Sequence, residues 1–299
     1  MRILLTGGTG LIGRSLCRHW AAQGHELWVW SRRPRQVPDL CGPTVRGLGD
    51  LNELGSQPLD AVINLAGAPI ADRPWTDARR TELRDSRIAL TEHLLAWLAL
   101  QEQRPQVLIS GSAVGWYGDA GEQRVTEQSA PADRGFAASL CGAWEDAARR
   151  AEALGMRVVL LRTAPVLARD GGMLRRLLPV FRLGLGGPMG SGRQWMPWIH
   201  LHDQVALIDF LLCHPQARGP YNACSPQPVR NRAFAQALGR AVHRPALLTV
   251  PAFALRLLGE LSGLLLGGQR AMPERLLAEG FEFRFVDLDA ALTELLGHH

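Results

Sequence analysis

A glycine-rich turn at residues 6–13 (TGGTGLIG) restricts the fold of this chain more than any other feature. Residues 2–6 (RILLT), just before it, form an apolar run with the length of a buried strand. Residues 11–23, after it, carry apolar side chains at helical spacing. A strand that passes through a tight glycine turn into a helix is the beginning of a βαβ unit, so the sequence predicts a parallel sheet from its start.

The same alternation of strand and helix continues over the first half of the chain. Apolar, β-branched runs that predict strands buried on both faces occur at 26–30, 60–65, 106–111 and 157–162. Amphipathic stretches at 77–100 and 137–154 predict helices between them. Strands that alternate with helices favour a doubly wound parallel sheet with helices on both faces.

This pattern loosens after about residue 168. The later segments predict a Gly/Pro-rich loop at 184–197, a helix at 204–213, a short strand at 219–223 and a second helix at 231–242. The tail at 245–299 predicts helices that flank a short strand. We therefore predict an α/β fold with a Rossmann-type doubly wound sheet in residues 1–165. Residues 166–299 would form a smaller C-terminal α/β substrate lobe, with some exchange of chain between the lobes.

The composition excludes several kinds of chemistry and several partners. All 33 basic residues are arginine, so a Schiff-base lysine, a P-loop lysine and a lysine proton relay are impossible. The net charge of +5 is modest and no basic run occurs, which argues against nucleic-acid binding. The five cysteines are scattered, which is typical of reduced and mostly buried thiols. No segment is suited to be a signal peptide or a membrane span, so we expect a cytoplasmic protein.

The spacing of the glycines indicates a dinucleotide site. Gly7, Gly10 and Gly13 fit a G-x-x-G-x-x-G pattern. The first glycine permits a tight turn, Gly10 lets the backbone approach a pyrophosphate, and Gly13 lets the helix pack closely on the strand. Glycine turns also occur for structural reasons alone, and it is the strand–turn–helix context that favours the nucleotide here.

The end of the second predicted strand indicates which dinucleotide would bind. An NAD site usually carries Asp or Glu about 20 residues past the glycines, bonded to the ribose 2′-hydroxyl. This strand ends in Trp30, Ser31, Arg32 and Arg33, with no carboxylate. Because a guanidinium offers a planar fork to phosphate oxygens, the pair favours the 2′-phosphate of NADP(H). The alternative is a solvated arginine pair at a strand end.

Four segments together resemble the extended short-chain dehydrogenase/reductase superfamily, the group of sugar-nucleotide epimerases. They are its glycine motif, the segment under the cofactor, the strand end with the catalytic serine and a later loop and strand: TGGTGLIG, NLAG (64–67), SGSAVGWYG (110–118) and GSGRQWMPWIHLHD (190–203). WEDAA, FRLGLGGPMGSGRQ and LGGQRAMPERLLAEGFEF resemble one atypical branch, the epimerase-family proteins with a C-terminal domain of unknown function. The resemblance covers nearly the whole chain.

This resemblance implies a catalytic Ser, Tyr and Lys, of which the chain keeps one. In the superfamily the tyrosine exchanges a proton with the substrate oxygen while hydride moves at the nicotinamide. The lysine lowers the pKa of the tyrosine, and the serine orients the substrate. Ser112 matches the serine, whereas Phe136 and Leu140 stand at the tyrosine and lysine positions. Neither of these two side chains can move a proton.

The chain has only two tyrosines that could replace the missing proton donor. Tyr117 follows Ser112 closely, and the resemblance places its ring beside the nicotinamide, so it is the better candidate. Its pKa would stay at about 10 without a neighbouring cation, which Arg87 or Arg162 would have to supply. A packing role with a satisfied hydroxyl is an alternative of at least equal weight. Tyr221 matches a position that the superfamily fills with a packing aromatic, so we expect it in the core.

The resemblance also implies which residues contact the cofactor. They come from the glycine turn, the end of the second strand, the NLAG segment, the 77–100 helix and two later strand positions: Gly7, Thr9, Gly10, Leu11, Ile12, Gly13, Ser31, Arg32, Arg33, Leu65, Ala66, Gly67, Glu82, Arg87, Ser110 and Val166. Arg87 stands where the superfamily has an asparagine four residues before a helical threonine, here Thr91. Together with Glu82 it is expected to brace the cofactor.

Two later motifs argue against particular ligands. Nucleotide-sugar enzymes tend to carry Arg-Asp before the element matched here by WIH, and that arginine grips the substrate diphosphate. Met196 and Pro197 stand there instead, with Arg193 nearby in another register, which argues against a nucleotide sugar. The H-x-H-D run at 200–203 has no third ligand at a persuasive spacing, so we expect a structural turn and no metal.

Two functions of different classes remain open. The first is an NADP(H)-binding oxidoreductase or epimerase of an unidentified small-molecule substrate, with Ser112 and Tyr117 as catalytic residues. The second is a non-catalytic NADP(H)-binding sensor or scaffold, favoured by the loss of the Tyr–Lys pair. Neither function requires nucleic acid or a membrane. Superfamily members often pair through first-domain helices, so a homodimer through 77–100 and 137–154 fits the fold by analogy.

Overall fold

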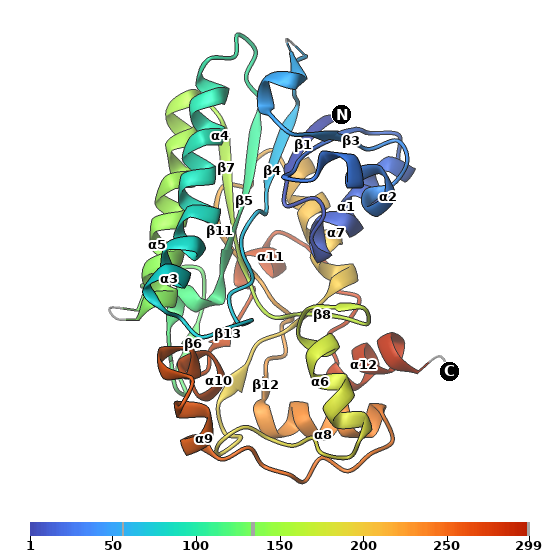
Figure 1. Cartoon of the computed structure of the whole chain (residues 1–299), viewed down its shortest axis with the longest axis vertical. Helices are drawn as coiled ribbons and strands as arrows, with labels where there is room; N and C mark the ends of the chain where they lie inside the picture. The colour runs from blue at the N-terminus through green and yellow to red at the C-terminus, as the bar shows by residue number, and fades with distance from the viewer. Residues whose placement is uncertain (56, 133–134, 298–299) are drawn as a thin grey trace.

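A fully parallel, seven-stranded sheet forms the centre of the computed structural model, which describes residues 1–55, 57–132 and 135–297 (Figure 1). Its strands lie in the order β11-β7-β5-β4-β1-β2-β3. Their bounds are β1 (Arg2–Thr6), β2 (Glu26–Trp30), β3 (Arg46–Leu48), β4 (Ala61–Asn64), β5 (Val107–Ala113), β7 (Arg157–Thr163) and β11 (Gly219–Ala223). The order reverses between β1 and β4, which makes the carboxyl ends of these two strands the switch point of a doubly wound fold. The predicted Rossmann-type α/β fold is confirmed.

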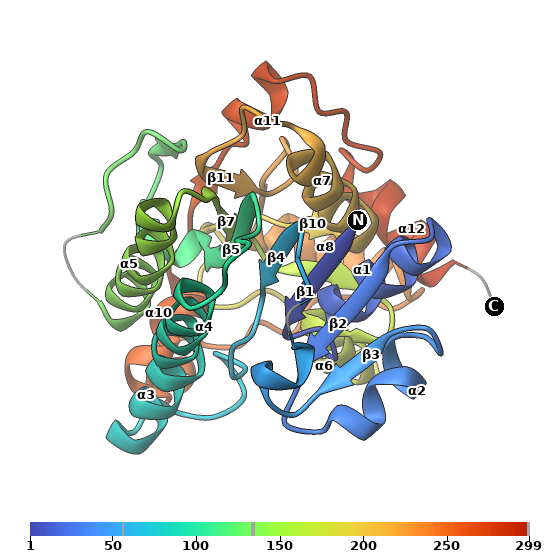
Figure 2. The ribbon, with the colours of Figure 1, turned by 90° about the horizontal axis from the view of Figure 1, so that it is seen from above.

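Helices cover both faces of this sheet, as Figure 2 shows from above. One face carries α1 (Leu11–Ala22), α2 (Val37–Cys41) and α7 (Leu201–Cys213), and the other carries α4 (Leu90–Ala99) and α5 (Phe136–Arg149). Ile3 of β1 belongs to the core on the first side and Leu4 to the core on the second. Successive side chains of a strand point to opposite faces, so a strand buried on both sides is continuously apolar.

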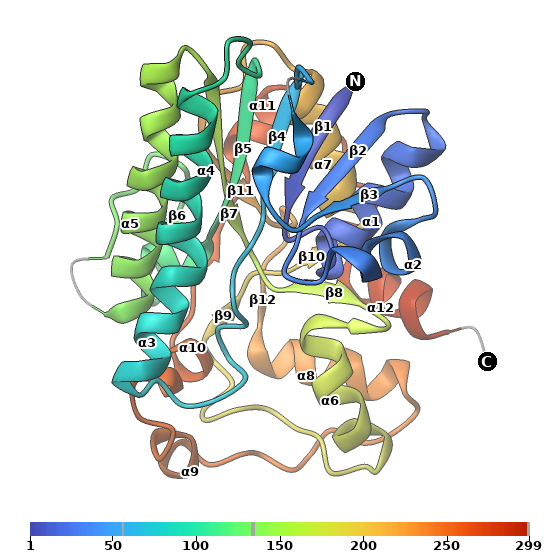
Figure 3. The same cartoon turned by 45° about the horizontal axis from the view of Figure 1, so that its top comes forward.

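The C-terminal lobe lies beyond the carboxyl ends of the strands (Figure 3). Its helices are α6 (Gly172–Arg182), α8 (Asn231–Ala241), α9 (Ala252–Arg256), α10 (Gly263–Leu266) and α12 (Leu288–Leu296), whereas α11 (Glu274–Ala278) packs beside β11, where Leu276 joins the core of the sheet. Short strand pairs join them: β8 (Val166–Ala168) with β10 (Ile199–His200), β9 (Trp195–Met196) with β12 (Val229–Arg230), and β6 (Arg124–Val125) with β13 (Arg270–Ala271). A separate apolar core centred on Trp198, Phe234 and Leu292 holds this lobe together.

The observed elements include the predicted ones, and the structure adds elements that the sequence did not predict: α2, α6, β3 and the short strands β6, β8 and β12. The strands expected at 2–6, 26–30 and 219–223 have these bounds, and the tail contains helices flanking the short β13. The sequence did not predict β3, which has only three residues. The helix expected at 77–100 contains α3 (Asp77–Arg84), a π-helical turn (Asp85–Ala89) and α4.

The five cysteines are free thiols, and all but Cys213 are buried, as the sequence predicts. Within the described part of the chain, no helix combines the length and the hydrophobicity needed to cross a membrane.

Candidate functional site

The turn after β1 has the backbone geometry of a phosphate-binding loop. Gly7 has a φ of +68°, and a Cβ there would lie 2.6 Å from the carbonyl carbon of Leu65. A Cβ on Gly13 would lie 2.4 Å from the carbonyl oxygen of Gly7. Gly10 is exposed and begins α1 without a side-chain cap, so the first amides of the helix are open to an anion.

Three of the predicted cofactor segments meet at this turn. Leu65 and Ala66 of the NLAG segment lie directly against Gly7. Gly172, at the start of α6, lies against both Leu11 and the carbonyl of Val166, so the fold brings those two predicted residues to the same place. The other predicted residues of these segments lie close by in the chain. Thr9 of the glycine turn and Ile12 of α1 are half-buried, and Gly67, which ends the NLAG segment, is exposed.

The end of β2 presents two arginines next to the glycine turn. Trp30 of β2 pairs with Thr6 of β1, so the residues that follow each strand are neighbours. The amide of Arg33 donates to the hydroxyl of Ser31 at 3.1 Å, which shapes the turn. Arg32 and Arg33 are exposed, and neither side chain forms a hydrogen bond or ion pair with any described residue. Both guanidinium groups are therefore available to a ligand.

A buried polar network ties the switch-point strands together. The amide of Asn64 donates to Thr91 at 2.8 Å and to Ser110 at 3.2 Å, and its oxygen accepts from Thr6 at 2.7 Å. The hydroxyl of Thr6 in turn accepts from the backbone N–H of Ala66 at 3.1 Å. Ser110, predicted to contact the cofactor, is fully buried, and its hydroxyl helps to orient Asn64.

Glu82 and Arg87, predicted to act as a pair, lie apart. Glu82 is exposed and forms ion pairs with Arg73 at 3.0 Å and Arg79 at 2.7 Å. Arg87, on the π-helical turn, donates to the backbone oxygens of Ala68 at 2.9 Å and Leu83 at 3.1 Å and lies against Gly67. Burial lowers the pKa of Arg87. Its position beside the NLAG segment agrees with the prediction, whereas its expected partnership with Glu82 is absent from the described contacts.

The positions of the missing tyrosine and lysine lie in an apolar cluster. Phe136 packs edge-on against Trp75, with ring centroids 5.0 Å apart, and Leu140 lies in the same cluster. Leu261 of the C-terminal tail completes it. Glu260, one residue earlier, accepts a hydrogen bond from the backbone N–H of Phe136 at 2.8 Å. The tail therefore covers the place at which the superfamily holds its proton relay.

Ser112 belongs to a buried ion-pair network. Its hydroxyl donates to Glu145 Oε1 at 2.7 Å, and Arg162 donates to the same carboxylate at 2.8 and 3.0 Å. The side chains of Glu145 and Arg162 are only 1% and 3% exposed. Burial opposes the charge of Arg162, yet its hydrogen bonds to Glu145 raise its pKa above the ordinary value. The hydroxyl of Ser112 is thus already engaged by a protein carboxylate.

Tyr117 joins the other end of this network. Its hydroxyl donates to Asn222 Oδ1 at 2.7 Å and accepts from Arg162 Nη1 at 3.1 Å. Arg162, and not Arg87, is therefore the cation beside this tyrosine. Tyr117 is 4% exposed, and burial raises its pKa to about 12 although Arg162 and the hydrogen bonds oppose the shift. This hydroxyl is protonated and satisfied at neutral pH.

Glu145 and Asn222 are the members of this network that the sequence did not single out. Glu145 lies one turn beyond Cys141 on the buried face of α5. A carboxylate among the apolar positions of a helix is the signal that indicates a buried partner, because an unpaired charge is rarely buried. Tyr221, next to Asn222, is fully buried as expected, and its hydroxyl donates to Glu279 at 2.9 Å.

The H-x-H-D run joins the end of β10 to the first turn of α7, where the sequence interpretation expected a structural turn. His200 caps α7 by accepting from the backbone N–H of His202 at 3.1 Å. Asp203 accepts from the backbone amides of Arg284 and Phe285 at 3.0 and 2.9 Å, which ties the tail to α7. Among the described residues, no group of three or more His, Cys, Asp or Glu side chains could hold a metal ion.

Comparison with known proteins agrees with this architecture. The NAD dependent epimerase/dehydratase family profile matches residues 3–224, and that of a domain of unknown function, DUF1731, matches residues 250–295. The chain is 43% identical over 294 residues to epimerase family protein MT2273 of Mycobacterium tuberculosis (strain CDC 1551 / Oshkosh), which covers 97% of this chain and 96% of that protein. It is 37% identical over 300 residues to epimerase family protein SDR39U1 of Mus musculus, covering 99% of this chain and 100% of that one. The crystal structure of human epimerase family protein SDR39U1 (isoform 2) with NADPH is 34% identical, with a TM-score of 0.89 over 100% of both chains.

Proposed function

Because this chain belongs to the NAD dependent epimerase/dehydratase family, as its motifs predict, we propose that it binds NADP(H) across the carboxyl ends of β1 and β2. The observation that carries the proposal is the pair of exposed guanidinium groups of Arg32 and Arg33, which have no partner among the described residues and lie beside the open glycine turn. A relative 34% identical to this chain was crystallised with NADPH, which supports the choice of dinucleotide.

The residues present fit this cofactor. The close approaches at Gly7 and Gly13 leave no room for side chains in the turn, and the exposed N-terminus of α1 suits a pyrophosphate. Arg32 and Arg33 would hold the 2′-phosphate through charge-assisted hydrogen bonds. The bound cofactor would supply hydride. The part of the site that normally moves the proton is filled by Phe136 and Leu140, so binding is the function that the geometry supports best.

We expect tight binding of NADPH and weak binding of NADH. Each lost hydrogen bond to the charged phosphate costs about 1.5–3 kcal/mol of binding free energy. The double variant Arg32→Ala with Arg33→Ala should therefore weaken NADPH binding roughly tenfold to a hundredfold or more. NADH, which lacks the 2′-phosphate, should bind the variant and the wild type alike. Titrations followed by nicotinamide fluorescence measure both affinities.

Arg46→Ala is the control for the loss of an exposed arginine elsewhere on the sheet. Arg46 is exposed on β3, where it pairs with Trp28 well before the end of β2, so its loss should leave both affinities unchanged. Equal binding of NADPH and NADH by the wild type would contradict the NADP(H) assignment. Binding of neither nucleotide would contradict the dinucleotide site itself.

An oxidoreductase or epimerase with Ser112 and Tyr117 as catalytic residues is the second candidate. One contact favours it, the 3.1 Å hydrogen bond from Arg162 to the hydroxyl of Tyr117, because a cation beside a tyrosine hydroxyl favours its ionised form. The pKa of about 12 keeps this tyrosine protonated, so at neutral pH it could only donate a proton, as carbonyl reduction requires.

This candidate predicts a specific pH dependence and a specific mutant. NADPH consumption with an accepted carbonyl substrate should stay level with pH until the pH approaches 12, the pKa to which burial raises Tyr117. Tyr117→Phe should then lower turnover roughly a hundredfold or more while NADPH affinity is unchanged. Equal turnover in the variant would remove Tyr117 from the chemistry, and absence of turnover across a broad carbonyl panel would favour the non-catalytic sensor.

A further inference from the structure

Exposed apolar side chains gather at the end of the C-terminal lobe that points away from the sheet. Among the described residues, eleven large apolar side chains are exposed, and eight of them belong to residues 180–185 and 247–257. These segments are the end of α6 with the loop after it, and the chain that leads from α8 through α9, all at the lower end of Figure 1. Six of the eight are more than half exposed, and we call them the apolar patch: Leu183, Leu185, Leu247, Leu248, Phe253 and Leu257.

Backbone hydrogen bonds hold the two segments of the patch side by side. The amide of Leu248 donates to Gly186 O at 3.2 Å, and the amide of Val250 donates to Pro188 O at 2.9 Å. The oxygen of Val250 in turn accepts from the amide of Gly190 at 2.9 Å. The loop after α6 and the chain before α9 therefore run next to each other, and they present their apolar side chains from one ordered stretch of backbone.

The packing of the lobe itself does not use the patch. Phe181 of α6 and Leu255 of α9 are buried, so each segment already directs other apolar side chains into the protein. Phe253 and Leu257 lie one helical turn apart, which places them on the same side of the chain, and their exposed fractions are 72% and 85%. Adjoining exposed apolar side chains on a soluble domain mark an interaction surface. The patch is therefore a candidate surface that leaves water when the protein meets a partner.

The charge around the patch has one sign. Residues 171–202 and 226–259, which contain both of its segments, carry nine arginines and no aspartate or glutamate. The whole chain carries 33 basic and 28 acidic residues, so its negative charges lie outside these two stretches. A surface of this composition has a positive potential at neutral pH and attracts anionic partners.

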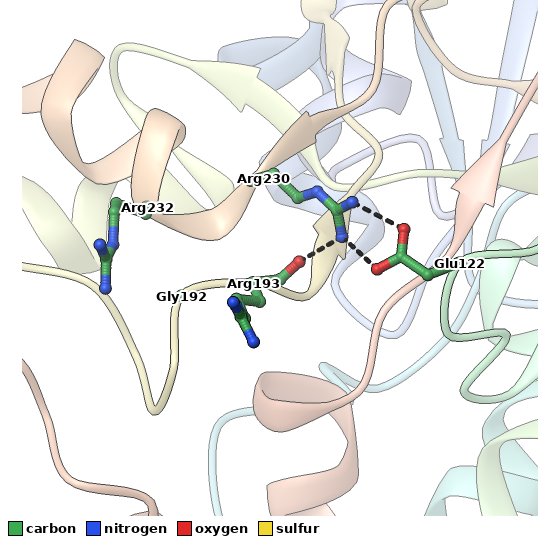
Figure 4. A pocket seen from close by; sticks show the side chains of 5 residues that line it. All are labelled: Glu122, Gly192, Arg193, Arg230 and Arg232. Carbon is green, nitrogen blue, oxygen red and sulfur yellow. Dashed lines mark hydrogen bonds and ion pairs between the residues drawn. The ribbon is translucent and has the colours of Figure 1, made fainter.

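Few of these arginines are neutralised by carboxylates from other parts of the chain. Arg230 pairs with Glu122 at 2.6 Å, as Figure 4 shows, and Arg240 pairs with Asp289 at 2.7 Å. The remaining seven form no ion pair with any described residue. Three of these seven stand next to or close to members of the patch in the chain: Arg182, Arg244 and Arg256.

We propose that this end of the C-terminal lobe docks on a membrane surface that contains anionic phospholipids. The apolar patch would enter the boundary between headgroups and acyl chains, and the arginines around it would face the negative headgroups. A second copy of the chain fits less well, because a symmetric contact would bring the arginines of both copies together. A lipid layer also adapts to six separate side chains, whereas a protein partner would need a matching surface. This is contact with one face of the membrane, since α9 has only five residues.

Sedimentation of the full chain with lipid vesicles tests this proposal. Vesicles of equal parts phosphatidylcholine and phosphatidylglycerol should bind the protein, pure phosphatidylcholine should bind it far less, and added salt should weaken the binding. Phe253→Ala combined with Leu257→Ala should weaken partition into the anionic vesicles about tenfold or more, because less apolar surface leaves water. Arg182→Gln combined with Arg256→Gln should weaken it about tenfold as well, through the loss of two charges.

Leu100→Ala and Arg104→Gln are the matched controls for the two kinds of variant. Leu100, which is 83% exposed, and Arg104 lie between α4 and β5, at the end of the sheet opposite the C-terminal lobe, so both changes should leave vesicle binding unchanged. All the replaced side chains of the patch and its arginines are exposed, so the variants should fold, which thermal unfolding checks.

Three results would overturn the proposal. The first is a wild-type protein that stays in solution with anionic vesicles, or double variants that both bind like the wild type. The second is equal binding to pure phosphatidylcholine, which would remove the role of the arginines. The third is self-association in analytical ultracentrifugation that Phe253→Ala with Leu257→Ala abolishes, because a second copy would then cover the patch. The experiment needs no nucleotide, so its outcome is independent of NADP(H) binding.

Discussion

Glu145→Ala is expected to lower the free energy of unfolding by about 3–5 kcal/mol, because it leaves the charge of Arg162 buried without a carboxylate. Glu145 accepts three hydrogen bonds, one from Ser112 and two from Arg162, and both charged side chains are almost fully buried. A loss of this size is a large part of the stability of a typical domain. Equilibrium unfolding in urea, followed by circular dichroism, measures it.

Two further variants separate the ion pair from the shape of the side chain. Glu145→Gln keeps an acceptor for Ser112 and Arg162, so we expect it to be destabilised less than Glu145→Ala, and it remains testable if the alanine variant fails to fold. Glu145→Leu combined with Arg162→Met replaces both charges by apolar groups, so the double variant should recover part of the free energy of unfolding that Glu145→Ala loses. A Glu145→Ala protein with the unfolding midpoint of the wild type would show that Arg162 finds other partners.

This network also bears on the proposed catalysis, because it includes Ser112, the residue that matches the catalytic serine of the superfamily. Ser112 lies at the end of β5, as its match to the superfamily predicts, but its hydroxyl donates to Glu145. Tyr117 donates to Asn222 and accepts from Arg162. Hydrogen bonds made inside the core hold these hydroxyl groups in place, which favours the packing interpretation of Tyr117 over its role as an acid.

Most of the fold could be predicted because its signals are local. The strands at 2–6 and 26–30 are apolar runs buried on both faces, and the glycine turn links the first of them directly to a helix. The loss of the proton relay at Phe136 and Leu140 was implied by the resemblance to the superfamily. The strand and helix predictions needed only neighbouring residues and a period of two or 3.6 residues.

The rest depends on contacts between distant parts of the chain. Arg162 and Glu145 come from β7 and α5, and Asn222 comes from β11, so no local pattern indicates that they meet. The ion pairs of Glu82 with Arg73 and Arg79 are a second contact that the sequence did not indicate. Glu122 and Arg230, which form an ion pair, are more than a hundred residues apart, so only the tertiary fold brings them together.

Gly13→Ala is expected to weaken both NADPH binding and the fold, whereas Gly10→Ala should weaken binding alone. A Cβ on Gly13 would lie 2.4 Å from Gly7 O and 2.5 Å from Gly8 Cα, so α1 must move away from the turn. Overpacking of this kind costs about 1–3 kcal/mol, more than alanine gains in helix propensity. A Cβ on Gly10 meets only Gly7 O, at 3.1 Å, and otherwise projects toward the space assigned to the pyrophosphate.

The comparison of these two variants tests the turn more sharply than either one alone. Both should lower NADPH affinity roughly tenfold or more, in fluorescence titrations, while only Gly13→Ala lowers the unfolding midpoint. Gly263→Ala, at the beginning of α10 with nothing within 4 Å of a new Cβ, is the matched control and should change neither quantity. Gly10→Ala that binds NADPH like the wild type would contradict the placement of the pyrophosphate, because a backbone in contact with phosphate oxygens has no space for a methyl group at that residue.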